Sequence, residues 1–180
     1  KPVQDGLRVF HNGRGTYDVV LPKIKELIAT HRSRPIGARV TLTQKHLNVI
    51  EIYRHLTDEL GFKEVGLAPV TTKDHRDYAI TPESKDSMLE QFKELAEEWL
   101  QHALRDEHHG FTNVTDTIEE IHKGVSKAYG CGAGLGLLGV ATDGDVSLCH
   151  RFAGSPEHTI GSVADGVDRE KQEQFLVDHH

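Results

Sequence analysis

The first seventy residues alternate between segments with a helical pattern of apolar residues and segments with a strand-like pattern. Apolar residues recur every three or four positions over 16–34 and 47–60, which predicts two helices. Residues 36–43 and 62–70 are short apolar runs, the first rich in β-branched residues, which predicts two strands. Strands joined through a helix are normally parallel, so this order predicts an α/β sheet or barrel. We expect the first fifteen residues to be loop-like.

Threonine and proline mark the ends of the predicted first helix. Thr16 is the expected N-cap, and Asp18 places a negative charge in the first turn. Pro22 fits a first turn better than a helix interior, so we expect the regular part of the helix to begin nearer Leu21. Pro35 marks where the helix must have ended.

A longer helix is predicted after an irregular polar stretch at 71–80. Thr81 supplies an N-cap, Pro82 suits the first helical position, and Glu83 places an acid in the first turn. The expected core face consists of residues at helical spacing, namely Met88, Phe92, Leu95, Trp99 and Ala103. A shorter helix is predicted over 112–127.

The pattern changes near Tyr129. Beyond it glycine becomes dense, long helical periodicity stops, and two strand-like segments at 138–142 and 146–148 flank the Asp143-Gly144 turn. We therefore place a domain boundary near residue 128.

The composition argues against several classes of function. The formal net charge is −7, from 28 acidic and 21 basic residues, which argues against a protein that binds nucleic-acid backbones. No apolar run approaches about 18 residues, so we expect no membrane span. The N-terminus lacks the pattern of a signal peptide. Two cysteines are too few for a disulfide scaffold, so we expect a reducing, cytoplasmic location.

Cys131 and Cys149 are the only thiols, and with Gly144 they form a C-x12-G-x4-C pattern. Three interpretations fit this spacing. The thiols could fill core volume, they could bind zinc together with His150 or His158, or they could be ligands of an iron–sulfur cluster. Two thiolates are too few to hold a metal centre alone, so a cluster needs further ligands from elsewhere.

Glycines 134, 136 and 139 match the G-x-G-x-x-G pattern of dinucleotide-binding loops. That fingerprint needs a strand before it and a helix after it. Here a cysteine precedes it, and a strand and a turn follow, so we do not expect a dinucleotide. We expect these glycines to let the backbone approach a bulky group beside Cys131.

Two arginines are unusual for their positions. Arg8 lies in a predicted loop, where it is either a solvated turn residue or a clamp for a carboxylate or phosphate. Arg39 interrupts an otherwise apolar strand, where an unpaired charge is costly. It therefore indicates either a structural salt bridge or a ligand site at the open edge of the sheet.

The C-terminal block carries a resemblance to a known family. It runs from Cys131 through the Asp143-Gly144 turn to Cys149-His-Arg-Phe152, and continues to Ile160-Gly-Ser-Val163. It resembles the start of a SPASM domain, the auxiliary-cluster domain of radical S-adenosylmethionine (SAM) peptide-modifying enzymes. The family pattern opens C-x9–15-G-x4-C, which this sequence fits.

The upstream segments are similar to the radical SAM barrel. Residues 5–18 look like the segment after its fourth strand, while 39–43 and 65–70 look like its fifth and sixth strands. The fold class that this resemblance implies is α/β. Residues 1–128 would be the C-terminal half of a partial (β/α)6 radical SAM barrel, and 129–180 the N-terminal part of a small SPASM auxiliary-cluster domain.

The resemblance implies a maturase that acts on a peptide or protein substrate. In this family a [4Fe-4S] cluster on a C-x3-C-x2-C motif reduces SAM to a deoxyadenosyl radical. The radical abstracts hydrogen from a substrate carbon, to which a substrate cysteine sulfur then bonds. The branch that this sequence resembles most matures quinohemoprotein amine dehydrogenase, so a subunit of that enzyme is the expected substrate.

Two departures from the family pattern affect this expectation. The C-x3-C-x2-C motif and the C-x2-C-x5-C-x3-C run of the auxiliary clusters are absent, and the chain opens with Lys1. We therefore expect an internal fragment that is inactive on its own. Sulfatase-maturing relatives carry Asp directly after the second cysteine, whereas this chain has His150, so that activity is not expected.

The resemblance also implies site residues. Cys131 and Cys149 would ligate an auxiliary [4Fe-4S] cluster, and Arg8 and Arg39 would contact SAM, Arg8 through its carboxylate or ribose. The substrate would cross the barrel mouth near three residues, Gln44, Pro69 and Thr71. Two other classes remain open: a non-catalytic module that binds a leader peptide, and a structural zinc protein.

Overall fold

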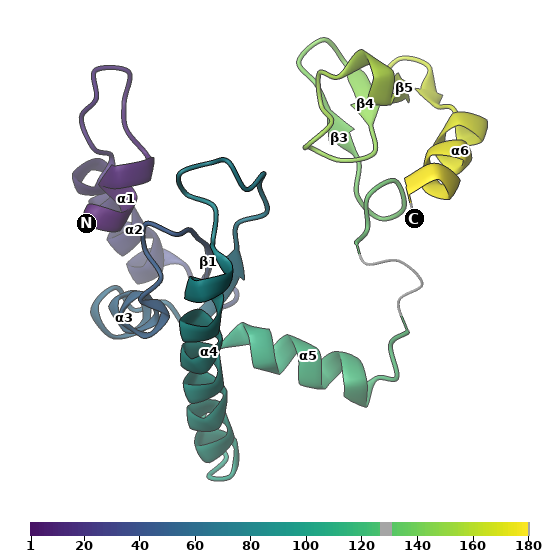
Figure 1. The fold of residues 1–180 in the computed structure, drawn as a ribbon. Coiled ribbons are helices and arrows are strands. Elements are labelled where there is room, and N and C mark those ends of the chain that lie inside the picture. The colour runs from purple at the N-terminus through teal and green to yellow at the C-terminus, as the bar shows by residue number, and fades with distance from the viewer. Residues whose placement is uncertain (127–130, 180) are drawn as a thin grey trace. The chain divides into compact units, whose positions relative to one another are not determined.

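The computed structural model describes residues 1–126 and 131–179 (Figure 1). The chain divides into two compact units, Lys1–Gly124 and Val125–His180, and each has its own hydrophobic core. The boundary predicted at residue 128 lies outside the described residues. No helix among the described residues is long and apolar enough to cross a lipid bilayer.

The first unit combines helices with a pair of parallel strands. In chain order its elements are α1 (Pro2–Leu7), α2 (Tyr17–Thr30), β1 (Gly37–Leu42), α3 (Val49–Arg54), the π-helix η1 (His55–Glu59), β2 (Glu64–Pro69), α4 (Pro82–Ala103) and α5 (Thr112–His122). β1 and β2 pair in parallel, with Gly37 opposite Glu64 and Leu42 opposite Pro69. The predicted parallel α/β arrangement is confirmed.

The start of α2 differs from the prediction. The helix begins at Tyr17 and contains Pro22 in its interior, so the expected start near Leu21 is wrong. The backbone N–H of Tyr17 donates to Asp5 Oδ1 at 2.8 Å, while the Thr16 hydroxyl donates to a backbone oxygen of the preceding segment. Asp5 therefore accepts from a free backbone N–H at the start of α2, in place of the Thr16 side chain. Because Pro22 has no backbone N–H, α2 lacks one intrahelical hydrogen bond.

The N-terminal segment contains the short helix α1 in place of the expected loop. Pro2 occupies the first turn of α1, where its missing N–H has no intrahelical partner to lose, and Asp5 lies in the same turn. After α1 the chain forms a tight hairpin, in which Val9 bridges to Gly15. The hairpin brings the Asp5 carboxylate to the start of α2.

Two predicted helices end at glycines with left-handed backbone conformations. Gly61 follows η1 with φ +81°, and Gly124 follows α5 with φ +63°. These conformations are readily adopted by glycine and stop a helix. α5 accordingly ends at His122, whereas the predicted helix extends to residue 127, which lies outside the described residues.

The core of the first unit lies between β1, β2 and the helices α3 and α4. Thr81 caps α4 as predicted, and Met88 and Leu95 on its predicted core face are buried, whereas Ala103 is exposed. The buried apolar residues of the cluster are Leu42, Val49, Tyr53, Phe62, Val65, Leu67, Met88, Leu95 and Phe111.

The second unit is built on a small antiparallel sheet. Its elements are β3 (Gly139–Val140), β4 (Asp145–Ser147), the 3-10 helix η2 (Pro156–His158), β5 (Thr159–Ser162), β6 (Gly166–Val167) and α6 (Arg169–His179). The strand order is β3-β4-β5-β6. Val146, Leu148 and Ile160 form its core. The predicted turn at Asp143-Gly144 joins β3 to β4, with Gly144 at φ +96°.

Candidate functional site

The β1–β2 pair has one buried face and one open face. Side chains alternate between the faces of a strand, and in β1 the more buried positions are Ala38, Val40 and Leu42. Arg39 and Thr41 occupy the other face and are exposed. The charged residue that interrupts the apolar strand therefore points away from the core.

Arg39 lies across β2 because position 66 has no side chain. Arg39 and Gly66 are opposite each other in register. A Cβ atom at Gly66 would lie 3.3 Å from Arg39 Cδ and 3.0 Å from Thr112 Oγ1. Any larger residue at position 66 would have to displace the Arg39 side chain.

The Arg39 guanidinium forms no ion pair with any residue that the structure describes. Of the two interpretations of Arg39, the structural salt bridge therefore receives no support in the described part of the chain. An exposed guanidinium that is held over a glycine is suited to binding a carboxylate or a similar anion.

Arg8 lies in the connection between α1 and the hairpin. Its backbone oxygen accepts hydrogen bonds from the N–H and the hydroxyl of Thr16, at 3.2 and 2.9 Å. Its side chain is exposed, and none of the described residues forms an ion pair with it. The backbone of Arg8 thus has a structural role, while its guanidinium is available to a ligand.

The outer edge of β2 is closed by α5 and the residues before it. The backbone N–H of Val65 donates to the Gly110 oxygen at 2.7 Å. Further along, Asn113 Oδ1 accepts from the N–H of Leu67 at 2.9 Å, and Asn113 Nδ2 donates to the Leu67 oxygen at 2.8 Å. The Asn113 amide therefore takes the place of a neighbouring strand, and the sheet can be extended only from β1.

Replacing Asn113 with alanine should destabilise the first unit by about 2–4 kcal/mol, because the buried N–H and C=O of Leu67 would both lose their partners. The measurement is urea unfolding followed by the fluorescence of Trp99 in α4. Thr117→Ala, at an exposed position of the same helix, is the matched control and should change stability by less than about 0.5 kcal/mol. Equal effects of the two substitutions would contradict this role of Asn113.

The carboxyl edge of β2 opens into a cavity of about 500 Å³. Pro69, Val70 and Met88 contribute to its lining, so one of the three residues expected near the substrate lies there. Gln44 is held by a hydrogen bond, in which its Oε1 accepts from the Ser84 hydroxyl at 2.5 Å. Thr71 is exposed.

The two cysteines differ in environment. Cys131 is exposed and Cys149 is buried, and they are not joined by a disulfide. Within the described residues, no group of three or more His, Cys, Asp or Glu side chains could hold a metal ion. The described residues thus do not complete a cluster site. The described residues also do not assemble the alternative zinc site with His150 or His158.

The His158 ring packs against aromatic side chains of the second unit. Its ring stacks on Phe152 at 4.4 Å and on Phe175 at 5.9 Å between centroids. The Ser155 hydroxyl lies 2.7 Å from its Nδ1. These contacts account for His158 without a metal.

Two glycines of the G-x-G-x-x-G pattern are explained by close contacts within the second unit. A Cβ atom at Gly139 would lie 2.4 Å from the backbone oxygen of Cys149, and one at Gly134 would lie 2.6 Å from Leu148 Cδ2. These contacts explain the glycines at positions 134 and 139 without a bulky group beside Cys131. They allow the loop to lie directly against the Cys149 segment.

His109 lies in a polar stretch of the sequence, which predicts a surface residue, and the structure shows that this prediction is wrong. His109 is 8% exposed, stacks on Tyr53 and lies 3.9 Å from a carboxylate oxygen of Glu98. Burial lowers the pKa of His109. The nearby Glu98 carboxylate raises this pKa by a smaller amount, and His102 lowers it further. Burial also raises the pKa of Tyr53 to about 12, so its phenol stays neutral.

We expect the first unit to lose stability as the pH falls below about 6.5. The lowered pKa of folded His109 means that the unfolded chain binds this proton more readily. The contribution of neutral His109 to stability is therefore fully present at pH values above the pKa of His109 in the unfolded chain. It is lost as the pH falls towards the lower pKa of His109 in the folded chain. His109→Gln should flatten the dependence of the unfolding midpoint on pH between 7 and 5, whereas His75→Gln, at an exposed position, should not. An unchanged slope in His109→Gln would refute the assignment.

Comparison with solved structures shows a likeness of fold. No family model matches the chain, and no curated protein matches it. A solved structure titled "Native anSMEcpe with bound AdoMet" resembles it with a TM-score of 0.68, at 19% sequence identity. The likeness covers 92% of this chain and 46% of that one, so the chain spans less than half the length of the solved protein. It shows that the chain has a mixed α/β, radical SAM-like fold.

Proposed function

We propose that this chain is part of a radical SAM maturase that installs a thioether-type crosslink in a peptide or protein. The observation that carries the proposal is the structural likeness to a protein with bound AdoMet over 92% of the chain. The SPASM-like pattern around Cys131 and Cys149 favours the peptide-modifying branch of the radical SAM enzymes. A quinohemoprotein amine dehydrogenase subunit is the proposed substrate.

The open face of β1–β2 supplies residues that fit SAM. Arg39 offers an exposed guanidinium over Gly66, and Arg8 offers a second one on another element. Because SAM carries a carboxylate, a planar guanidinium that is not engaged by the protein suits it. When bound and cleaved by one electron from the reduced [4Fe-4S] cluster, SAM would supply the carbon-centred radical that removes hydrogen from the substrate. The part of Arg8 and Arg39 is to bind and orient the SAM carboxylate or ribose.

The closed edge of β2 supports the place of these strands in a barrel. The Asn113 amide occupies the position that a further strand would take beside Leu67. β2 is then a terminal strand, and additional strands would pair with β1. This agrees with the resemblance of β1 and β2 to the fifth and sixth strands of a six-stranded partial barrel.

The auxiliary cluster is proposed on the sequence pattern alone. Cys131 and Cys149 would each supply one thiolate, and the remaining ligands would come from sequence beyond this chain. The described residues bring no third ligand to either thiol. We therefore derive no chemical step through that cluster.

The proposal is tested by determining the coding sequence on both sides of this segment. A C-x3-C-x2-C motif within roughly one hundred residues upstream, with a C-x2-C-x5-C-x3-C run shortly downstream, would support it, since Fe–S clusters are held by such thiolates. If the mature protein instead ends near Lys1 and His180, two cysteines remain and the proposal fails.

A further inference from the structure

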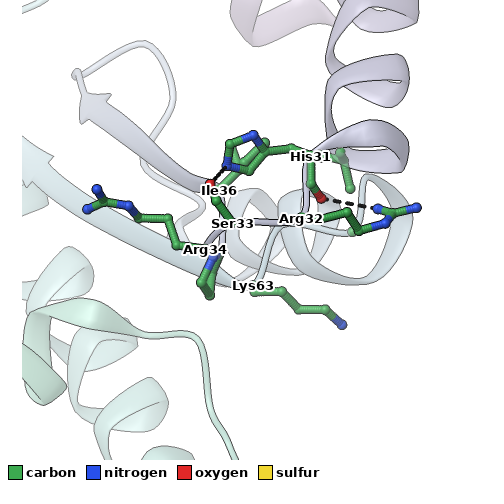
Figure 2. Close-up of a pocket in the computed structure, with 9 residues that line it drawn as sticks. His31, Arg32, Ser33, Arg34, Ile36 and Lys63 are labelled. Carbon is green, nitrogen blue, oxygen red and sulfur yellow. Dashed lines mark hydrogen bonds between the residues drawn. The ribbon is translucent and has the colours of Figure 1, made fainter.

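A basic pocket lies at the amino end of the β1–β2 pair, within the first unit (Figure 2). Its volume is about 450 Å³, within the range of small-molecule sites. Three segments meet there: the end of α2, the connection 32–36 that leads into β1, and the turn that leads into β2. Ligands of α/β enzymes bind at the carboxyl ends of the strands, so this pocket lies away from the proposed SAM site.

The formal charges that line this pocket are all positive. Arg32, Arg34 and Lys63 contribute three cations, and no acidic side chain is among the lining residues. The chain as a whole has a net charge of −7, so this clustering runs against its composition. Like charges around a concave surface repel one another and concentrate a positive potential there.

The cations of the pocket lack protein partners of opposite charge. None of the described residues forms an ion pair with Arg32, Arg34 or Lys63. Arg32 donates instead to the backbone oxygen of His31 at 3.1 Å. Figure 2 shows this bond, and it shows Arg34 and Lys63 extended with no hydrogen bond to the other residues drawn. The fold therefore leaves at least two charged groups free to bind an anion.

The rest of the lining combines apolar residues with the polar side chains of His31 and Ser33. Ile28, Pro35 and Ile36 provide carbon surface, and Gly61 adds a turn without a side chain. Such a surface lowers the local dielectric constant around the cations and strengthens their attraction for a negative charge. Arginine binds planar or tetrahedral oxyanions through two N–H groups, and lysine adds a point charge.

We propose that this pocket binds a small-molecule oxyanion with at least two negative charges, carried by phosphate or carboxylate groups. This site is separate from the open face of β1–β2, and it does not depend on the proposed function. Arg32 and Lys63 are the principal ligands, because Figure 2 shows their charged ends on the same side of the pocket, whereas Arg34 extends to the other side. They approach from the segments before β1 and β2, so one anion can bridge the two connections.

The test is isothermal titration calorimetry, in which the 180-residue chain is titrated at low ionic strength with pyrophosphate and, separately, with citrate. We expect saturable binding of at least one of them, which weakens as NaCl is added. Binding of pyrophosphate alone assigns phosphate chemistry, and binding of citrate alone assigns carboxylate chemistry. The double variant Arg32→Ala/Lys63→Ala should weaken binding at least tenfold, or about 1.4 kcal/mol.

The matched control removes the same charge elsewhere in the first unit. Arg14→Ala/Lys93→Ala alters two exposed cations that do not line the pocket, and it should leave the affinity within about twofold. Both pocket side chains are exposed, so their removal should not unfold the chain, which circular dichroism checks. Absence of binding by both anions, or equal weakening by the two double variants, would overturn the proposal.

Discussion

Replacing Gly139 with alanine should unfold the second unit. The new Cβ atom would lie 2.4 Å from the backbone oxygen and 2.5 Å from the carbonyl carbon of Cys149, where neither side can rotate away. Overpacking against a backbone costs about 3 kcal/mol or more. Small domains are stable by only a few kcal/mol, so this cost removes most of the stability of the sheet.

The two thiols provide the measurement for this prediction. In the metal-free chain a thiol reagent should modify exposed Cys131 at once and buried Cys149 slowly. In Gly139→Ala both thiols should react at once. Gly136→Ala is the matched control, because nothing lies within 4 Å of its Cβ position, and it should retain one slow thiol. Continued protection of Cys149 in Gly139→Ala would show that the close contact is not required.

Replacing Arg39 with alanine in the full-length protein should weaken SAM binding by about 10- to 150-fold. This range corresponds to the loss of a charge-assisted hydrogen bond worth about 1.5–3 kcal/mol. Arg39→Lys should recover part of the affinity, because lysine keeps the charge and loses the planar two-pronged geometry. Equilibrium dialysis with radiolabelled SAM measures the dissociation constant.

The control for Arg39 is an arginine in the connection that precedes the same strand. Arg34→Ala changes the same residue type, three positions before β1 begins at Gly37, and should leave SAM affinity unchanged. Unfolding midpoints of both variants should equal that of the unaltered protein, since both side chains are exposed. Full SAM affinity in Arg39→Ala would remove Arg39 from the SAM site.

The sequence predicted those features of the fold that depend on neighbouring residues. The parallel pair β1–β2 follows from two short apolar runs separated by a helical pattern. The start of α4 follows from Thr81-Pro82-Glu83, because capping groups act within one turn. The resemblance to the radical SAM family rested on a cysteine–glycine spacing, and the likeness of fold agrees with it at the level of the radical SAM-like fold.

Features that depend on contacts between distant residues could not be predicted. Asp5 replaces Thr16 at the start of α2 through a hairpin that the hydrophobic pattern does not reveal. Asn113 closes β2 from 46 positions away. Gly139 was expected to make room for a bulky group beside Cys131, and only the structure shows the Cys149 backbone against it. In each case a polar or small residue makes a hydrogen bond or a close contact with a residue far away in the sequence, which the local pattern of residues does not reveal.

If the proposed function is right, this chain belongs to an enzyme that cleaves SAM reductively. The direct measurement is the release of 5′-deoxyadenosine by the full-length protein, after anaerobic reconstitution with iron and sulfide and addition of SAM and a reductant. We expect release from the full-length protein and none from the 180-residue chain, whose two cysteines cannot hold the SAM cluster. A full-length protein that binds iron and sulfide but releases no 5′-deoxyadenosine would contradict the proposed function.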